Sequence, residues 1–375
     1  IGANLADPGG TLSAGKTYVV FGKASGFTES VNLSLLDGTT GFVLNGIDDT
    51  DNSGQAVATA GDVNGDGYSD ILIGARMADY SEEYTDTGES YLIFGRASGF
   101  SASVDLSSLD GVSGTVFNGL IGNGSLIGFS VSTAGDVNGD GYADILIGAA
   151  WADFLLGVNT GAAYVVFGQT NGFGASLDLA SLDGTKGFVL KGVDAEDYTG
   201  ASVNSAGDIN GDGYDDILIG AKQADPDGDT DAGETYVVFG KSGSFGASLD
   251  LSSLDGTNGF VLEGIDASDY SGSSVSTAGD VNGDGYDDVL IGAYYADPNG
   301  SMSGETYLVF GKSESFDSSL DLSTLNGTNG ITFKGVDAEN YSGRSVSTTG
   351  DVNGDGYDDI LISAPWADLG ENSMA

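Results

Sequence analysis

The stretch Asp62-Val63-Asn64-Gly65-Asp66-Gly67-Tyr68-Ser69-Asp70 decides how this sequence folds, because close copies return four more times. The copies occupy residues 136–144, 208–216, 280–288 and 351–359, at spacings of about 72 residues. Self-similarity at a fixed period indicates a repeat architecture in which each unit is one supersecondary element. The repeat covers essentially the whole chain of 375 residues, without a visible linker.

Each unit contains four short apolar segments, separated by Gly, Asp and Asn. In one unit they are segment A at 57–60, B at 71–75, C at 91–95 and D at 115–119. Their length and their Val, Ile, Tyr and Phe content predict β-strands. Four antiparallel strands per unit, repeated around an axis, predict an all-β propeller with small-residue strand A innermost. A stacked solenoid is the alternative, but its repeats are usually shorter than about 50 residues.

The two ends of the chain leave the closure of the propeller open. Segments C and D occur first at 17–22 and 41–46, and A and B occur last at 345–349 and 360–364. Paired together, the ends would complete one blade and close a five-bladed ring. Residues 1–3 also match the end of strand B and compete for that position, so a piece of a longer array is the alternative, and the sequence does not decide between the two. We treat 1–375 as a single domain, with repeats at about 1–72, 73–146, 147–218, 219–290 and 291–361, and 362–375 completing the seam.

Composition excludes several classes of function. The chain has 56 Asp and Glu against 11 Lys and Arg, with no His and no Cys, for a net charge of −45. So acidic a chain is unsuited to nucleic acids and is repelled by anionic membranes. We also expect no membrane insertion, because no apolar run reaches the roughly 18 residues of a spanning helix. Chemistry that needs His or Cys, including zinc sites and thiol nucleophiles, is absent.

The repeated A–B loop has the ligand pattern of a calcium site. Its positions 1, 3, 5 and 9 carry oxygen side chains, position 6 is always Gly, and position 7 offers its backbone carbonyl. A simple Asp-Gly or Asn-Gly turn is the alternative, but five copies with oxygen at every ligand position favour calcium over it. We expect about five Ca²⁺ ions, with these residues as ligands: Asp62, Asn64, Asp66, Tyr68, Asp70, Asp136, Asn138, Asp140, Tyr142, Asp144, Asp208, Asn210, Asp212, Tyr214, Asp216, Asp280, Asn282, Asp284, Tyr286, Asp288, Asp351, Asn353, Asp355, Tyr357 and Asp359.

The motif resembles a known repeat. Strand A carries Gly-x-Ser-Val at 128–131, the loop reads Gly-Asp-Val-Asn-Gly-Asp-Gly-Tyr-x-Asp, and strand B ends Ile-Gly-Ala. This resembles the FG-GAP repeat of the integrin α-subunit β-propeller and its bacterial relatives. The recurrent insert between C and D, as at 245–256, is similar to repeats of large bacterial, notably cyanobacterial, surface proteins. The resemblance implies calcium in these loops, on the face opposite the usual ligand face. The Phe of the name-giving pair is replaced in every unit, and family propellers usually have seven blades.

Strand parity predicts where a partner would bind. In an up-and-down blade the A–B and C–D loops share one face, and the B–C and D–A loops share the other. The second face collects aromatic residues that stack on sugars or anchor proteins. The repeating Tyr198, Tyr270 and Tyr341 are expected to pack between blades, whereas the candidates for a ligand face are Tyr84, Trp151, Phe154, Tyr294 and Tyr295.

Three functions fit these observations. The first is an extracellular or cell-surface, calcium-dependent propeller that binds a protein or glycan by the face opposite the calcium loops. The second is a self-associating component of a surface fibre, sheath or surface layer. The third, a carbohydrate-active enzyme, is disfavoured because the symmetric repeats show no singular constellation of acids and bases. We therefore predict a protein that is not an enzyme.

Overall fold

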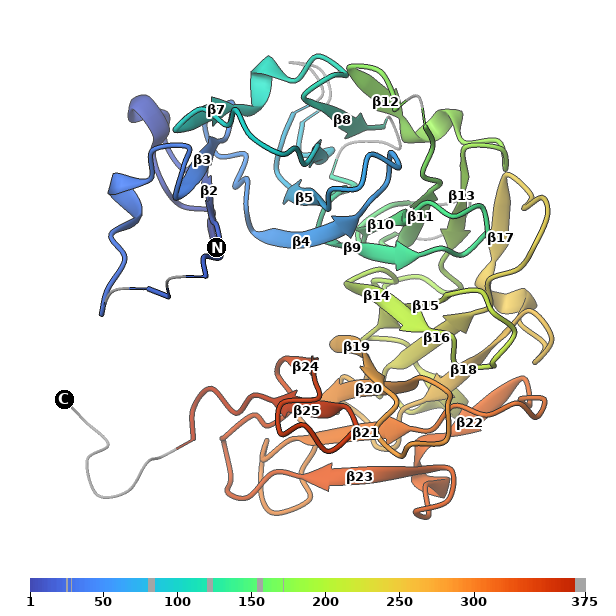
Figure 1. Cartoon of the computed structure of the whole chain (residues 1–375). Coiled ribbons are helices and arrows are strands. Elements are labelled where there is room, and N and C mark those ends of the chain that lie inside the picture. The colour runs from blue at the N-terminus through green and yellow to red at the C-terminus, as the bar shows by residue number, and fades with distance from the viewer. Residues whose placement is uncertain are drawn as a thin grey trace.

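The chain folds into six β-sheets arranged side by side around an arc (Figure 1). The structure, a computed structural model, describes residues 1–24, 26–27, 29–79, 85–119, 124–153, 158–170 and 172–367. Each of the second to fifth sheets contains strands A, B, C and D in antiparallel order, as the sequence predicts. In the second sheet they are β4 (Ala56–Gly61), β5 (Asp70–Ala75), β6 (Glu89–Ile93) and β8 (Gly114–Asn118).

The third to fifth sheets repeat this order, whereas the first and sixth contain only part of it. The third sheet contains β9 (Ser130–Gly135), β10 (Asp144–Ala149), β11 (Ala162–Val166) and β13 (Gly187–Lys191), and the fourth contains β14 (Ser202–Gly207), β15 (Asp216–Ala221), β16 (Glu234–Val238) and β18 (Gly259–Glu263). The fifth sheet contains β19 (Ser274–Gly279), β20 (Asp288–Ala293), β21 (Glu305–Val309) and β23 (Gly330–Lys334). The first sheet contains β1 (Gly2–Ala3), β2 (Lys16–Val20) and β3 (Gly41–Asn45), and the sixth contains β24 (Val346–Gly350) and β25 (Asp359–Ile362).

The A strands line the inside of the arc, and the core lies between successive sheets. Each A strand contacts the next, from β4 through β9, β14 and β19 to β24. Strand B is buried on both faces: Ile145, Leu146 and Ile147 of β10 have no exposed surface. This explains why the B segments are apolar without alternation, since neighbouring blades cover both sides. Small side chains in strand A allow the close approach of the innermost strands.

The insert between strands C and D reaches over to the preceding sheet. The last four of the five inserts each add a short strand parallel to strand D of that sheet, which the expected four-stranded blade lacks. Its rings stack on the same strand: Phe316 lies 4.3 Å from Phe260, centroid to centroid. The added strands are β7 (Ser103–Asp105) on β3, β12 (Ser176–Asp178) on β8, β17 (Ser248–Asp250) on β13 and β22 (Ser319–Asp321) on β18.

Seven 3-10 helices of three residues each complete the described secondary structure. Four directly follow these added strands and bury a leucine, for example Leu251 or Leu322. The helices are η1 (Pro8–Gly10), η2 (Leu33–Leu35), η3 (Leu106–Ser108), η4 (Leu179–Ser181), η5 (Pro226–Gly228), η6 (Leu251–Ser253) and η7 (Leu322–Thr324).

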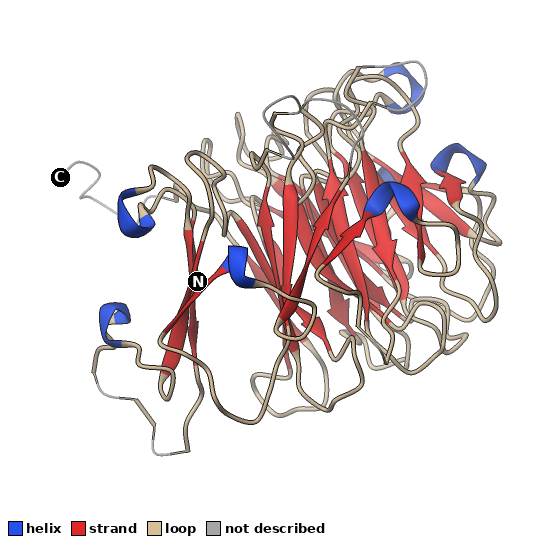
Figure 2. Cartoon of the chain, turned by 90° about the horizontal axis from the view of Figure 1, so that it is seen from above, coloured by secondary structure: helices blue, strands red, loops and turns tan. Residues whose placement is uncertain are grey.

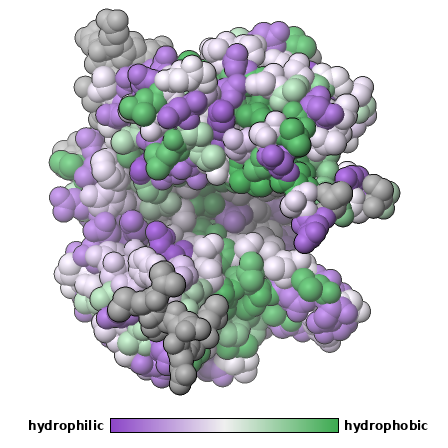
Figure 3. Space-filling view, turned by 90° about the vertical axis from the view of Figure 1, so that its left-hand side faces the viewer, coloured by the Kyte–Doolittle hydropathy of each residue, from purple (hydrophilic) through white to green (hydrophobic). Residues whose placement is uncertain are grey.

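The two ends of the chain do not form a shared blade, so the five-bladed closure, one of the two arrangements that the sequence left open, is not observed. Strand β2 pairs with β1, in the register Gly2↔Thr17 and Ala3↔Lys16, and the short β1 therefore occupies the place that β25 would need. The hairpin β24–β25 forms a two-stranded sheet of its own. The first and last sheets stand apart on the open side of the arc (Figure 1), and hydrophobic residues line the hollow seen there (Figure 3).

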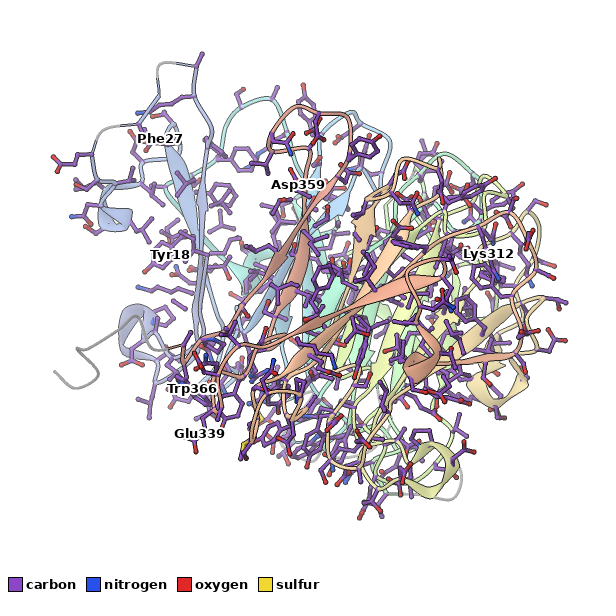
Figure 4. The ribbon with its side chains drawn as sticks, turned by 90° about the horizontal axis from the view of Figure 1, so that it is seen from below. Tyr18, Phe27, Lys312, Glu339, Asp359 and Trp366 are labelled. Carbon is purple, nitrogen blue, oxygen red and sulfur yellow. The ribbon has the colours of Figure 1, made fainter. Side chains whose placement is uncertain are left out.

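Loops gather at the two ends of the strands (Figure 2). Figure 4 places Phe27, Lys312 and Asp359, from C–D inserts and an A–B loop, toward one end, and Glu339 and Trp366 toward the other. The alternation of strand direction therefore separates two faces, as parity predicts. The division 1–72, 73–146, 147–218, 219–290 and 291–361, with 362–375, remains a prediction.

Candidate metal centre

The A–B loops fold around their own oxygen side chains. In the loop at 208–216, the Asp212 N–H donates to Asp208 Oδ1 at 3.0 Å and to Asn210 Oδ1 at 2.8 Å. The Gly213 N–H donates to Asp208 Oδ2 at 2.9 Å, and the Tyr214 N–H donates to Asp212 Oδ1 at 3.0 Å. Because one N–H bonds two of these oxygens, positions 1 and 3 converge on the interior of the loop.

The other loops repeat this arrangement. The bonds accepted by positions 1 and 5 recur in all five loops, and the bond accepted by position 3 recurs in the first four. The Asp351 carboxylate of the last loop is fully exposed, and hydrogen bonds from backbone N–H groups lower its pKa. The loops therefore have one common shape that the Asp and Asn side chains fix.

The aspartate at position 9 has a different role, because it joins two loops. Asp216 Oδ2 accepts the Ile209 N–H at 3.1 Å, and its Oδ1 accepts the Gly240 N–H at 2.8 Å, at the end of strand C. Asp70, Asp144 and Asp288 make the matching pair of bonds. These four carboxyls are at most 1% exposed.

Burial raises the pKa of these position-9 carboxyls. It raises the pKa of Asp144 and Asp216 to about 8, of Asp288 to about 7 and of Asp70 to about 6, against the effect of their backbone hydrogen bonds. The acidic side chains at positions 1 and 5 raise it further. A buried carboxylate needs a compensating positive charge. The only salt bridge within the described residues joins Lys334 to Glu305, far from these loops in sequence.

The donor set fits a hard cation on chemical grounds. In the part of the chain that the structure describes, acidic side chains alone do not gather into a group of three or more that could hold a metal ion. A cation would therefore be held by a mixed set: the Asp carboxylates of a loop, its Asn amide oxygen and the carbonyl oxygen of its Tyr. Such all-oxygen sets, with a carbonyl at position 7, suit Ca²⁺.

Neighbouring loops also contact one another through residues whose roles the sequence did not reveal. The Tyr286 ring lies over Gly211 of the preceding loop, and Tyr142, Tyr214 and Tyr357 repeat this contact. The Asp287 carboxylate at position 8 accepts the Asp208 N–H at 2.9 Å; Asp215 and Asp358 do the same. The sequence signal for this contact between loops is the Asp-Asp pair at positions 8 and 9, which recurs in the last three loops.

Comparison with known proteins identifies the repeat. The family described as FG-GAP repeat matches residues 53–93, 128–166, 199–238, 271–309 and 342–373, which together make up about half of the chain. Each match spans strands A and B, and the first four extend through strand C. This chain belongs to the FG-GAP repeat family.

FG-GAP relatives include animal integrin α-subunits. Integrin alpha-PS2 of Drosophila melanogaster is 31% identical over 195 residues, or 51% of this chain and 12% of the relative. Integrin alpha pat-2 of Caenorhabditis elegans is 29% identical over 254 residues, or 64% and 18%. Phosphatidylinositol-glycan-specific phospholipase D of Bos taurus is 30% identical over 177 residues, or 46% and 19%. The chain thus spans less than a fifth of the length of these relatives.

The face opposite the FG-GAP loops carries the predicted aromatic residues that the structure describes. Trp151 is 43% exposed, and its ring lies 6.0 Å from that of Tyr198. Tyr294 and Tyr295 are half-buried, with their ring centroids 4.5 Å apart. Tyr84 and Phe154 lie outside the described residues. No helix among the described residues combines the length and the apolar character needed to cross a membrane.

The repeating tyrosines contact other aromatic rings on this face. Tyr270 packs edge to face on Tyr295 at 5.1 Å, and Tyr341 contacts Tyr295 at 5.6 Å and Trp366 at 4.4 Å. Tyr341 thus bridges the fifth and sixth sheets, as the expected packing between blades requires. These tyrosines nevertheless form one surface with the candidate residues Tyr294 and Tyr295.

Proposed function

We propose that this chain is a calcium-binding propeller module of the cell exterior that takes part in adhesion or ligand binding. The integrin relatives support a role in adhesion, and the five oxygen-lined loops support a dependence on Ca²⁺. The net charge of −45 also favours an environment that supplies divalent cations.

The buried position-9 carboxyls are the observation that carries the calcium proposal. Each of Asp144, Asp216 and Asp288 is fully buried beside a loop that holds two further carboxylates. A divalent cation held by the two other carboxylates, the Asn amide oxygen and the Tyr carbonyl of the loop would supply positive charge beside the buried carboxyl and would favour its ionised form. It would also hold the A–B hairpin to the start of the C–D insert, because the position-9 carboxylate bonds both.

Ion binding of this kind contributes to the free energy of folding. The unfolded chain lacks the convergent oxygens, so an ion that binds only the folded loop stabilises the fold by mass action. We expect dissociation constants of roughly 10⁻⁴ to 10⁻³ M, as in other extracellular modules.

The partner is proposed to be a protein or a glycan on the face opposite the calcium loops. Aromatic rings on exposed loops suit both classes of ligand. We infer a non-catalytic role, supported by the integrin relatives and by the symmetric repetition of the acidic residues. The match to a phospholipase D does not oppose this, because it covers 19% of that protein.

The test is a calorimetric melt of the chain in EDTA and in millimolar Ca²⁺, with the number of bound ions measured by titration calorimetry. The expected result for the wild-type chain is a large rise in Tm with calcium and about five bound ions. Asp212→Ala should reduce the calcium-dependent rise in Tm and remove one ion.

Asp255→Ala is the matched control, since Asp255 is an exposed loop carboxylate that bonds only nearby turn residues. It should leave the calcium-dependent rise unchanged. An equal Tm with and without calcium in the wild-type chain would overturn the calcium assignment. Polymers that form on calcium addition, seen by light scattering, would instead assign the surface-fibre role.

A further inference from the structure

The two sides of the open arc each present one half of a blade. Within the described residues, the first sheet has strands C and D but only the two-residue β1 in place of strand B, and the sixth has strands A and B alone. In the second to fifth sheets, strand B pairs with strand C over five residues. The outer edge of β25 and most of the matching edge of β2 therefore keep backbone groups that a further strand can pair.

Side chains that are buried between blades elsewhere are exposed at these two edges. Leu361 of β25 is 58% exposed, whereas the leucine at the same place in the other four repeats has no exposed surface. Val57 of β4 is 39% exposed, against 5 to 8% for the matching valines of the other A strands. It lines a groove of about 450 Å³ between β2 and the second sheet, where strands A and B of a complete first sheet would lie.

The last A–B loop lacks one of the bonds that the other four loops make. Asp359 Oδ2 accepts the Val352 N–H at 2.9 Å, as the other position-9 aspartates do in their loops. Their second bond comes from the glycine N–H that follows strand C, and the described part of the sixth sheet has no strand C. Asp359 is accordingly half-buried, whereas its four counterparts are buried. A strand C beside β25 would supply the missing donor.

The strand D edge of the fifth sheet is open in the same way. In the first four sheets, strand D pairs with the insert of the following repeat, but β23 has no such partner among the described residues. Ile331 of β23 is 41% exposed and lines a groove of about 470 Å³. On the other side of the opening, Phe27 of the first insert is 55% exposed, whereas the matching Phe316 stacks on a strand D ring.

We propose that the open side of the arc is a docking site for one FG-GAP repeat of another polypeptide, which enters in the strand order C–D–A–B. Strands C and D of this repeat complete the sixth sheet, and its strands A and B complete the first. Its insert pairs with β23, and its strand D receives the insert that carries Phe27. Each new contact continues the interface that already joins neighbouring repeats. The proposal goes beyond the calcium and adhesion functions and does not rest on them.

One repeat is the smallest occupant that satisfies both sides of the opening. Its strand B gains five residue pairs on β2 in the register of the other sheets and displaces the two pairs of β1. It also buries the apolar side chains Val57 and Leu361. A second copy of the chain offers the same strands, but it would bring six sheets to an opening that one arc bounds on both sides (Figure 1).

The test adds a polypeptide of residues 232–296 to the full chain at fixed calcium, because this stretch carries strands C, D, A and B in the required order. A lone repeat does not bury its apolar faces, so it is expected to fold as it docks. Light scattering should show one repeat bound per chain. In the complex, amides of β25 should exchange at least about tenfold more slowly than in the chain alone.

A second polypeptide, residues 271–336, is the matched control for strand order. It carries the same kinds of strand in the order A–B–C–D of a single blade, so it does not complete two half-blades at once. It should bind at least about a hundredfold more weakly, because it engages only one side of the opening at a time.

Leu361→Ser and Val57→Ser test the two sides of the opening separately. Each should weaken binding of the 232–296 polypeptide by about tenfold or more, as expected for the loss of a buried apolar side chain. Neither should lower the Tm of the chain alone, because both side chains are exposed there. Val112→Ser is the control variant, since Val112 is 83% exposed on a turn of the second insert, and it should leave the affinity unchanged.

Several outcomes would overturn the proposal. They are no binding by the wild-type chain, equal binding of the control polypeptide, two bound repeats per chain, and a loss of affinity in only one of the two edge variants. Dimers of the chain alone that both edge variants dissociate would also overturn it, since they would assign the opening to a second copy. The calcium-dependent rise in Tm tests the calcium module independently of all these results.

Discussion

At the scale of single residues, the loop glycines show how neighbouring repeats limit each other. Gly211, at position 4 of its loop, has a φ of 73°, and a Cβ there would overlap the Tyr286 ring of the next loop. Gly354 at the same position of the last loop has a φ of 78° but no atom near its Cβ position. A comparison of substitutions at the two glycines therefore distinguishes the energetic cost of backbone strain from the cost of disturbing the contact between loops.

We predict that Gly211→Ala destabilises the fold more than Gly354→Ala. The second change adds only the left-handed backbone cost of about 1–2 kcal/mol. The first adds displacement of Tyr286, about 1–3 kcal/mol more. Chemical denaturation of both variants at fixed calcium measures the difference. Equal losses of unfolding free energy would show that the ring moves aside without cost.

The loop pattern in the sequence also could not distinguish exposed aspartates from buried ones. Positions 1, 3, 5 and 9 read alike as oxygen ligands, yet the structure separates exposed Asp212 from buried Asp216. Position 9 is buried because strand B begins there and the C–D insert covers it. That contact comes from a residue 24 positions away, Gly240, and so lies outside any local pattern.

At the scale of elements, the C–D insert connects its own blade to the preceding one. Its short strand pairs in parallel with strand D of the preceding sheet, in the register Val261↔Ser319 and Leu262↔Leu320. Its phenylalanine stacks on the ring of that strand, and the lysine before it covers the other side. The insert therefore adds contacts between sheets to those that the A strands provide near the axis.

We predict that Phe316→Ala lowers the unfolding free energy by about 2–4 kcal/mol, because it removes the contacts with Phe260 and Phe239. Phe27→Ala is the control at the same place in the first repeat, where the ring is 55% exposed. It should cost less than about 1 kcal/mol. Similar losses of unfolding free energy for both variants would show that the insert does not stabilise the contact between blades.

At the scale of the whole molecule, each sheet depends on its neighbours for burial. Strand β15 is buried along its full length between the third and fifth sheets, whereas β25 has a sheet on one side only and Leu361 is 58% exposed. In repeat architectures stability is close to a sum of unit terms and neighbour terms, so the ends are the weakest.

Hydrogen exchange can test whether the last sheet is less stable than a central sheet, because one segment has the same sequence in both. Residues 215–219 and 358–362 have the same sequence, Asp-Asp-Ile-Leu-Ile, so their intrinsic exchange rates match. We predict that amides of β15 exchange at least about tenfold more slowly than those of β25. Mass spectrometry of the two peptides measures this, and equal protection would mean that the arc unfolds as one cooperative unit.

The sequence by itself determined the repeat, the four strands of each blade, the position of the loops and the division into two faces. The repeat follows from the spacing of about 72 residues between the loop copies, the strands from short apolar segments, and the two faces from the alternation of strand direction along the chain. It also predicted that residues 1–3 compete for the seam.

Only the tertiary structure decided how the repeats meet. The fifth strand from the insert and the Tyr-on-Gly and Asp bridges between loops join residues about 60 to 80 positions apart, and the seam between the two ends stays open. Such contacts depend on the spacing and register of whole sheets. A pattern within one repeat does not contain that information, because it describes a blade and not its neighbour.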